Sequence, residues 1–598
     1  MIERSQALAA LARDEFDVVV VGGGITGAGV ALDAAARGYS VALVERADYA
    51  SGTSSRSSKL VHGGLRYLQN FDLGLVREAL LERQLMVSLA PHLVRPLPLV
   101  VPAFEGAHPD RLVGVGLNLY DVMSRGRTGR QAGERRRKAE SWSPERHRVI
   151  SGDEVAELLP ALAAREPTSG YLFYDCQTDD VRLVLTVLGE AERFGAVCAN
   201  RVSVTGLLER DGRADGVHAL DGESGERFDV RAANVVNATG VWADQLRPRE
   251  LHEEAELPRI RPSRGTHVTL RHEDLPLVGG AIVPAGGSRT IFALPWLGHT
   301  LVGTTDNDYE GSLDHIQPSA EDVEYLLDAI NSFFDTSLAA DELTGAFAGV
   351  RPLISTGDPK KSVDISRKAE LYETSSGMIT ITGGKLTTWR RMAKMTVDRL
   401  VERDARDAPC RTHEIPLGQA IAVEELPRVE GVGPFAGGGD PYAALASRYG
   451  YAAREVLALA AERGELAQPI VEGLPDLLAE VALAARREQA RSIGDVLLRR
   501  TRLGLLAARR LLDARPPMGE PEPEPAGRSD APAAPQLATT PVARVGAVIA
   551  RELGWSDERL RLELARFGEE ARAEGLLVSE RAPAVAPGAG SPPGGRER

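Results

Sequence analysis

The chain has 598 residues, more than one hydrophobic core usually holds, so the sequence predicts two or three domains. Its formal net charge of −14 argues against nucleic-acid binding. The cysteines are few and widely spaced, which favours a reducing compartment over a disulfide framework or a metal site: Cys176, Cys198 and Cys410. Residues 1–17 are interrupted by charges and lack the apolar core of a signal peptide, and no run of about 18 apolar residues could span a membrane.

Residues 16–45 predict a strand, a tight turn, a helix and a second strand. The apolar, β-branched run Val18–Val21 reads as a strand buried on both faces. Three glycines follow it in the Gly-x-Gly-x-x-Gly register: Gly22, Gly24 and Gly27. Such glycines permit a sharp turn and a close approach to a pyrophosphate at the helix N-terminus. The second strand, Val41–Val44, ends at Glu45, which is placed to accept a hydrogen bond from a ribose hydroxyl and disfavours NADP. This fingerprint predicts a dinucleotide site but does not separate NAD from FAD.

The next segment, Ser51–Leu68, is rich in hydroxyls and then in glycine and charged or aromatic residues. Small hydroxylated side chains beside a dinucleotide fold can donate hydrogen bonds to a pyrophosphate or a flavin edge, although composition alone would also fit a solvated loop. On either side of Gly63 and Gly64, the segment combines a titratable group, a guanidinium and a phenol: His62, Arg66 and Tyr67. This combination favours a functional segment.

Here the sequence resembles a known family. TSSRSSKLVHGGLRYL and the earlier GGGITGAG are similar to motifs of the FAD-dependent respiratory glycerol-3-phosphate dehydrogenases, in the D-amino-acid-oxidase-like flavoprotein superfamily. Further matches follow in order along nearly the whole chain, at residues 234–244, 261–270, 303–306, 349–353, 382–393 and 493–505.

Between these motifs, helical spacing is clearest at Leu73–Leu89, where apolar residues predict a packing helix with an outward face of Arg77, Glu78, Glu82 and Arg83. Residues 111–127 are apolar but too short to span a membrane, and a basic run follows up to Lys138. This pattern fits either a buried helix with a solvated loop or an anchor on anionic lipid. The resembled family works at the membrane and passes electrons to quinone, so residues 108–138 are the expected contact of a protein attached peripherally to the cytoplasmic face.

From about residue 411 the composition changes. After a Gly/Pro-rich joint at residues 431–441, it becomes typical of helices. Residues 515–541 are Pro-rich and predict a disordered insertion, helix resumes at residues 542–571, and residues 582–598 predict a loose tail. The motif at residues 493–505 could be ordinary amphipathic packing.

The resemblance implies an α/β fold: a glutathione-reductase-type, Rossmann-like FAD-binding domain, an α+β substrate-binding domain with a mixed or antiparallel sheet, and a C-terminal all-α domain. The expected boundaries are residues 16–95, 150–250 and 345–405 for the discontinuous FAD-binding domain, 96–149 and 251–344 for the substrate-binding domain, and 411–580 for the helical domain.

It also implies oxidation of sn-glycerol 3-phosphate to dihydroxyacetone phosphate by hydride transfer to flavin N5, with a membrane quinone as acceptor. The residues carried over as substrate contacts are Arg66, Tyr67, His267, Arg351 and Lys385. Lys385 would serve either the substrate phosphate or the flavin N1 and C2 carbonyl, and Arg351 taken alone could be a structural ion pair. The expected FAD contacts are Gly22, Gly24, Gly27, Glu45, Ser54, Ser55, Ser57, Ser58, Lys59, His62, Gly63, Ala238, Thr239, Gly240, Asp306, Gly383, Gly384, Lys385, Leu386 and Thr387. No metal is expected.

The candidates for the catalytic base are His62, His267 and Arg351. The histidines rank first because their ordinary pKa values suit proton transfer, whereas arginine holds its proton tightly. Three alternatives remain open: a glycerol-3-phosphate oxidase that uses oxygen, a flavin- or lipid-binding scaffold whose site has lapsed, and an NAD-linked dehydrogenase. A homodimer is also compatible with the sequence.

Overall fold

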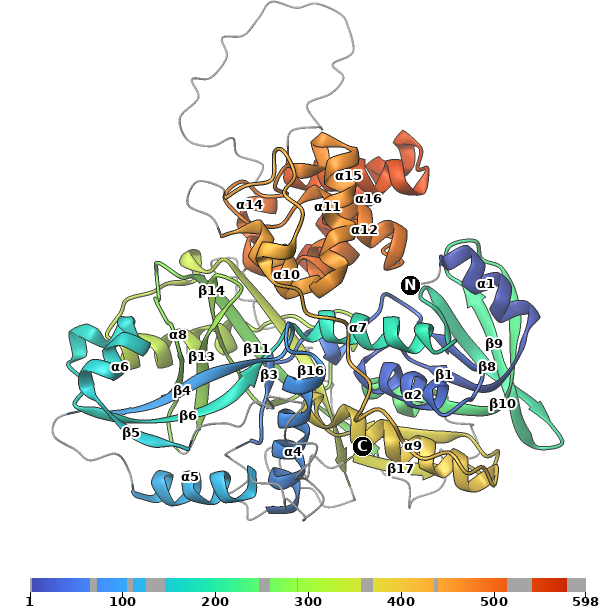
Figure 1. Ribbon diagram of the computed structural model, residues 1–598, viewed down its shortest axis with the longest axis horizontal. Coiled ribbons are helices and arrows are strands. Elements are labelled where there is room, and N and C mark those ends of the chain that lie inside the picture. Colours follow the sequence, from blue (N-terminus) through green and yellow to red (C-terminus); the bar gives the residue numbers. More distant parts are fainter. Residues whose placement is uncertain are drawn as a thin grey trace, which may run out of the picture.

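The computed structural model describes residues 3–64, 73–104, 111–124, 146–246, 259–287, 289–355, 369–434, 439–512 and 540–577. Two β-sheets lie side by side, and helices from the C-terminal part of the chain sit above both of them in Figure 1. The predicted fold class, an α/β architecture with a second mixed sheet and a C-terminal helical region, is confirmed.

The first sheet has the order β17-β18-β10-β1-β2-β7. Its parallel strands are β1 (Glu15–Val21), β2 (Val41–Val44), β7 (Val197–Ala199), β10 (Arg227–Asn237) and β18 (Ile379–Gly383). Antiparallel strands extend it: β17 (Ala369–Glu373) beside β18, and the hairpin of β8 (Val202–Arg210) and β9 (Arg213–Asp221) beside β10. The strands expected at Val18–Val21 and Val41–Val44 are therefore confirmed.

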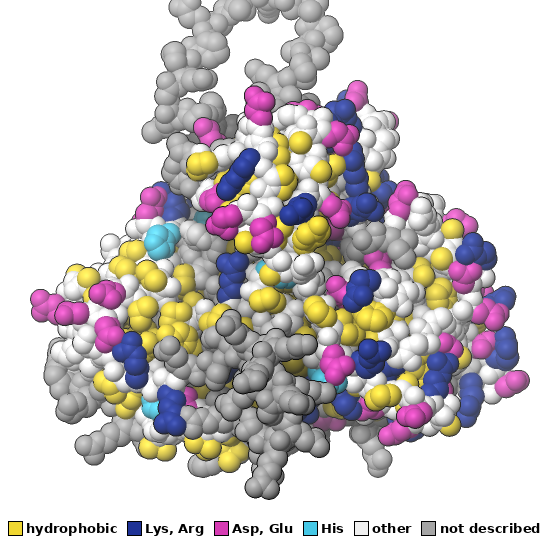
Figure 2. Space-filling model, in the orientation of Figure 1, with side chains coloured by type: hydrophobic (Ala, Val, Ile, Leu, Met, Phe, Trp, Pro, Cys, Tyr) yellow, Lys and Arg dark blue, Asp and Glu magenta, His cyan; other side chains and the backbone are white. Residues whose placement is uncertain are grey.

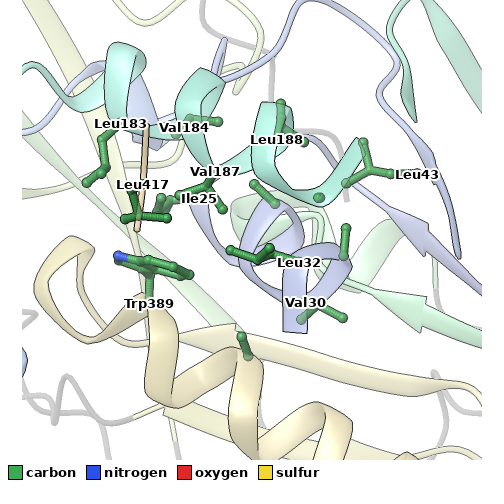
Figure 3. Packing of buried hydrophobic residues seen from close by; sticks show 14 of the residues in the cluster. Ile25, Val30, Leu32, Leu43, Leu183, Val184, Val187, Leu188, Trp389 and Leu417 are labelled. Carbon is green, nitrogen blue, oxygen red and sulfur yellow. The ribbon is translucent and has the colours of Figure 1, made fainter. Parts of the chain in front are cut away.

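Both faces of this sheet are covered, as the continuous valine run of β1 predicts. Val18 and Val20 pack on one side with α2 (Ile25–Ala36), α7 (Asp180–Arg193) and α9 (Trp389–Arg403), whereas Val19 and Val21 pack on the other with α1 (Arg4–Arg13). Figure 3 shows Trp389 of α9 beside residues of α2 and α7. A β-carbon at Gly29 would lie 2.6 Å from the Trp389 ring, so this glycine allows α2 and α9 to approach closely.

The second sheet has the order β15-β11-β14-β13-β12-β4-β6-β3, with β16 beside β11 and β5 beside β6. Its strands are β3 (Leu60–Val61), β4 (Arg95–Ala103), β5 (Arg148–Ser151), β6 (Ser169–Gln177), β11 (Arg259–Arg271), β12 (Gly280–Pro284), β13 (Thr290–Trp296), β14 (His299–Gly303), β15 (Asn307–Asp308) and β16 (Gly345–Ser355). The helices α6 (Gly152–Leu158) and α8 (Ala320–Phe334) contact it.

The expected domain boundaries differ from the observed sheets. β3, β6 and β16 fall in residues assigned to the FAD-binding domain, but all three belong to the second sheet. β6 pairs with β4 from Arg95↔Gln177 to Ala103↔Ser169, and β16 pairs with β11 from Arg259↔Ser355 to Thr269↔Gly345. These long antiparallel ladders connect segments far apart in the chain, which local sequence patterns do not reveal.

The C-terminal helices are α10 (Pro441–Tyr449), α11 (Ala453–Glu462), α12 (Leu478–Arg487), a π-helical segment (Asp495–Arg500), α13 (Leu503–Leu506), α14 (Ala508–Leu512), α15 (Pro541–Leu553) and α16 (Asp557–Ala573). They enclose a hydrophobic core of their own. The predicted insertion and tail lie outside the described residues, except that Thr540 caps α15, which begins at Pro541. Within the described residues, no helix combines the length and the apolar character needed to cross a bilayer.

The helix predicted at Leu73–Leu89 is present as α4, but the expected outward face is partly wrong. Glu82 and Arg83 are only 2% and 1% exposed. Glu82 accepts a hydrogen bond of 2.8 Å from Arg390 Nε of α9, and Arg83 donates one of 2.7 Å to the carbonyl of Tyr174 in β6. α4 contacts both the second sheet and the segment before α9. The helix therefore buries Glu82 and Arg83 in addition to its apolar face.

We expect Glu82→Gln to lower the free energy of unfolding by about 3 kcal/mol, because it leaves the buried guanidinium of Arg390 without its ion-pair partner. Urea unfolding followed by tryptophan fluorescence measures the effect. Glu78→Gln on the same helix is the matched control, and an equal loss of stability in both variants would contradict the role of the Glu82 ion pair.

Candidate active site

A cavity of about 1580 Å³ lies where the two sheets and the C-terminal helices meet. Its wall includes residues at or just after the carboxyl ends of parallel strands of the first sheet: Val21, Val44, Ala238 and Gly383. Ligands of open α/β sheets bind at this edge. The volume exceeds the roughly 300–1,000 Å³ of ordinary small-molecule pockets, so a dinucleotide and a second small molecule can share it.

The glycine turn at the end of β1 has the predicted close contacts. Gly22 has a φ of +113°, and a β-carbon there would lie 2.7 Å from the carbonyl oxygen of Ala238. A β-carbon on Gly27 would lie 1.9 Å from the carbonyl oxygen of Gly22. Gly22 and Gly24 line the cavity, whereas Gly27 lies behind the turn and permits α2 to pack against β1. Gly27 thus has the expected packing role rather than a place on the wall.

Glu45 lies on the cavity wall at the end of β2. Its Oε2 accepts a hydrogen bond of 2.7 Å from the Gly23 N–H, and its Oε1 accepts one of 2.8 Å from the Ala47 N–H. Burial raises the pKa of the Glu45 carboxyl, and the two backbone N–H donors oppose that shift. These bonds fix the carboxylate, and its remaining lone pairs leave capacity for a ribose hydroxyl.

Residues 51–59, called the serine loop below, cross from the first sheet to the second. Ser54, Ser57 and Ser58 line the cavity. The Ser57 hydroxyl donates to Asp180 Oδ2 over 2.7 Å, and Ser58 Oγ lies 2.9 Å from Nε2 of His267. The loop is therefore anchored at α7 and at β11.

Two expected FAD contacts of the serine loop, Ser55 and Lys59, lie off the cavity wall. The Ser55 hydroxyl donates to the carbonyl of Gly52 over 3.2 Å, and Ser55 is 2% exposed. Lys59 is fully buried, and its Nζ donates to the Ser55 carbonyl and to Asp180 Oδ2, each over 2.7 Å. Neither residue is on the wall. Ser55 lies behind the wall because its hydroxyl bonds within the loop, and Lys59 lies behind it because its amine pairs with Asp180 of α7.

The segments containing His62 and Lys385 meet at the wall. The His62 N–H donates to the Thr387 hydroxyl over 3.1 Å, and the same hydroxyl lies 3.2 Å from the His62 carbonyl. His62 and residues 383–387 all line the cavity. Gly63 does not; its N–H instead donates to the Tyr120 hydroxyl over 2.9 Å. Arg66 and Tyr67 lie outside the described residues.

Arg351 extends from β16 to the wall, and residues that follow β14 hold its guanidinium. Nη2 donates to Thr304 Oγ1 over 3.2 Å and to the Thr305 carbonyl over 3.1 Å, while Nη1 lies 3.3 Å from Asp306 Oδ1. The side chain keeps 22% exposure. The ion pair considered from sequence is thus present, and Arg351, Asp306 and Lys385 all line the same cavity.

His267 lies on the wall from β11, where it is 2% exposed and stacked on Phe347 with ring centroids 4.9 Å apart. Its Nδ1 is buried and finds no hydrogen-bond partner among the described residues. Burial, together with the positive charges of Lys59 and Arg351, holds the pKa of His267 well below its ordinary value of 6.5. The imidazole is therefore neutral at neutral pH.

Sequence reasoning missed the buried groups that support this wall. Asp180 binds the serine loop, and Asp175 accepts from Tyr120 over 2.6 Å beside Gly63. The only signal for Asp180 was an Asp-Asp pair before a helical pattern, which reads simply as a helix start. The remaining expected contacts on the wall are Thr239 and Gly240, which follow β10.

Comparisons with known proteins agree with this geometry. The family model described as "FAD dependent oxidoreductase" matches residues 17–399, and the one described as "C-terminal domain of alpha-glycerophosphate oxidase" matches residues 410–521. Glycerol-3-phosphate dehydrogenase 2 of Mycobacterium tuberculosis (strain ATCC 25618 / H37Rv) is 35% identical over 586 residues, which are 97% of this chain and 92% of the relative. Aerobic glycerol-3-phosphate dehydrogenase of Bacillus subtilis (strain 168) is 37% identical over 423 residues, 70% of this chain and 73% of the relative.

Among solved structures, the glycerol-3-phosphate dehydrogenase of Bacillus halodurans complexed with FAD matches with a TM-score of 0.71 and 27% identity, and covers 97% of this chain and 99% of that chain. The residues present fit FAD. The backbone around Gly22 and Gly27 has no room for side chains, and the Glu45 carboxylate is fixed at the end of β2. His267 is on the wall, and its buried Nδ1 has no hydrogen-bond partner among the described residues.

We expect Gly27→Ala to lower the FAD content of the purified protein roughly tenfold, because the added methyl group would displace the turn at Gly22. Absorbance of the released flavin per mole of protein measures it. Gly189→Ala on α7 is the control, since no atom lies within 4 Å of its added β-carbon. Normal FAD content in Gly27→Ala would refute the packing role of this glycine.

Proposed function

Because the chain belongs to the FAD-dependent oxidoreductase family and, within it, to the glycerol-3-phosphate dehydrogenases, we propose that it oxidises sn-glycerol 3-phosphate to dihydroxyacetone phosphate and passes the electrons to a membrane quinone. One observation carries the proposal: a single cavity joins a dinucleotide turn at Gly22 to the cationic side chains of Arg351 and Lys385. When bound, FAD supplies N5 as the acceptor of the hydride from the carbinol carbon.

Arg351 and Lys385 would bind the substrate phosphate. Thr304, Thr305 and Asp306 fix the Arg351 guanidinium, so little side-chain entropy is lost when it binds an anion. A guanidinium suits phosphate because two parallel N–H groups can engage two oxygens. Lys385, next to the left-handed Gly383 and Gly384, adds a second positive charge on the same wall.

We assign the catalytic base to His62. Histidine is the residue type whose imidazole most often acts as a general base, and the backbone of His62 is fixed by Thr387 on the wall. His267 would have to become an imidazolium in a buried site next to Lys59 and Arg351, which the depressed pKa disfavours. His267 would instead orient the substrate as a neutral group. Unchanged flavin reduction across pH in His62→Gln would refute this assignment.

Anaerobic addition of glycerol 3-phosphate is expected to bleach the flavin absorbance of the protein. Arg351→Met should require about tenfold more substrate for the same extent of bleaching, because one phosphate ligand is lost while the flavin site is intact. Arg271→Met is the control, because Arg271 is an exposed arginine at the end of β11 that pairs with Asp274. No bleaching in the wild type would contradict the proposed function, and an unchanged substrate requirement in Arg351→Met would contradict the phosphate clamp.

Reoxidation distinguishes the acceptors. Rapid reoxidation by a quinone analogue with little peroxide supports a dehydrogenase, whereas stoichiometric peroxide in air would favour an oxidase. A flavin that neither reduces nor reoxidises would favour the lapsed scaffold.

We further propose that α5 (Arg111–Ser124) attaches the protein peripherally to the cytoplasmic face of a membrane. One face of α5 packs inward through Leu117 and Tyr120, which are 1% and 2% exposed. The other presents Val115, Leu119 and Val122, which are 66%, 37% and 65% exposed. In Figure 2, hydrophobic side chains gather at the lower left edge, where Figure 1 places α5. The basic run at residues 125–138 lies outside the described residues.

The double variant Val115→Glu/Val122→Glu should weaken binding to vesicles containing anionic lipid at least roughly tenfold, because two apolar side chains no longer enter the interface. Vesicle co-sedimentation at low salt measures the partition. Val278→Glu is the matched control, because Val278 is 58% exposed but lies in the connection between β11 and β12 of the second sheet. Equal binding of all three proteins would refute α5 as the anchor.

A further inference from the structure

The C-terminal helices reach the serine loop directly, although the motif at residues 493–505 had no assigned role. We propose that Arg502 is a positioning residue that, through the carboxylate of Asp180, holds the serine loop in the shape that FAD binding requires. The proposal rests on FAD as cofactor and on the wall position of Ser57 and Ser58, and not on the identity of the substrate.

Asp180 joins the two parts of the chain. Arg502 Nη2 donates to Asp180 Oδ1 over 3.1 Å and to the Ser55 carbonyl over 2.9 Å. The other carboxylate oxygen, Oδ2, accepts from Lys59 Nζ and the Ser57 hydroxyl, each over 2.7 Å. Asp180, Lys59 and Arg502 are all fully buried. Water therefore does not replace any of these bonds when one is broken.

The backbone gives independent support. Lys59 and Arg502 have φ values of 61° and 68°, in the left-handed region that residues with side chains rarely adopt. Such conformations persist when the surroundings fix them. Both residues bind the carboxylate of Asp180. These three residues, called the Asp180 cluster below, fix the serine loop through Lys59 and the turn after the π-helical segment through Arg502. Burial alone would raise the pKa of Asp180, but Lys59 and Arg502 hold it below its usual value, so the carboxylate is charged.

The cluster continues to the cavity wall. Lys59 Nζ lies 5.0 Å from the Phe347 ring centroid, and His267 stacks on the same ring. Ser58, one residue before Lys59, binds His267 Nε2. A second link lies at the end of α16, where Glu574 pairs with Arg56 of the serine loop over 2.6 Å. A shift of Lys59 would thus displace Ser57 and also Ser58, the hydrogen-bond partner of His267.

The test compares full-length holoenzymes of wild type, Arg502→Met and Arg448→Met. Arg448 is a buried arginine, 7% exposed, that pairs with Asp476 and Glu480 within the C-terminal helical region. Two readouts are used: the Kd for FAD, from flavin fluorescence released on dilution, and the rate of tryptic cleavage after Arg56 and Lys59, from mass spectrometry. Neither needs substrate, so failure of the proposed dehydrogenase activity leaves the test intact.

We expect Arg502→Met to raise the Kd for FAD roughly tenfold or more and to speed cleavage at both sites, while Arg448→Met leaves both near wild type. Arg502→Lys, which keeps the charge, should restore part of the affinity and also serves if Arg502→Met does not fold. Wild-type values in Arg502→Met would overturn the proposal, as would wild-type values in Arg502→Lys where Arg502→Met does not fold. Equal effects of Arg502→Met and Arg448→Met would also overturn it, because they would reflect general loosening of the helices.

Discussion

The fold around the cavity depends on the buried carboxylate of Asp180, whose negative charge needs positive partners and hydrogen-bond donors. A charge without water is costly unless it is paired and hydrogen-bonded, and Asp180 has Lys59, Ser57 and Arg502 as partners. These partners come from the serine loop and the C-terminal helices, while Asp180 itself begins α7 on the first sheet. The partners of this one charge therefore connect three segments that are remote in the chain: the serine loop, α7 and the C-terminal helices. The serine loop also forms part of the cavity wall.

Both sheets contribute to the cavity wall. The first sheet contributes the glycine turn after β1 and the segments after β10 and β18, whose backbone N–H groups suit a diphosphate, together with the side chains of Glu45 and Lys385. The second sheet contributes the side chains of Arg351 and His267, set on adjacent antiparallel strands β16 and β11. The proposed function therefore draws on side chains from both sheets.

Local patterns predicted the parts whose physics is local. The valine run and the glycines specified β1, the turn and α2, and the helical spacing specified α4. Patterns could not predict that Lys59 turns away from the cavity or that Glu82 is buried, because both depend on partners more than a hundred residues away, Asp180 and Arg390. The ranking of the histidines used the ordinary pKa of the residue type, and no local pattern shows that burial, Lys59 and Arg351 lower the pKa of His267.

The most direct measurement is the crystal structure of the oxidised FAD complex with dihydroxyacetone phosphate, the proposed product. The account predicts phosphate density within hydrogen-bond distance of the Arg351 guanidinium, in the same cavity as a flavin lined by residues 383–387. Phosphate bound away from Arg351 and Lys385, or a flavin ring remote from His62 and His267, would contradict it.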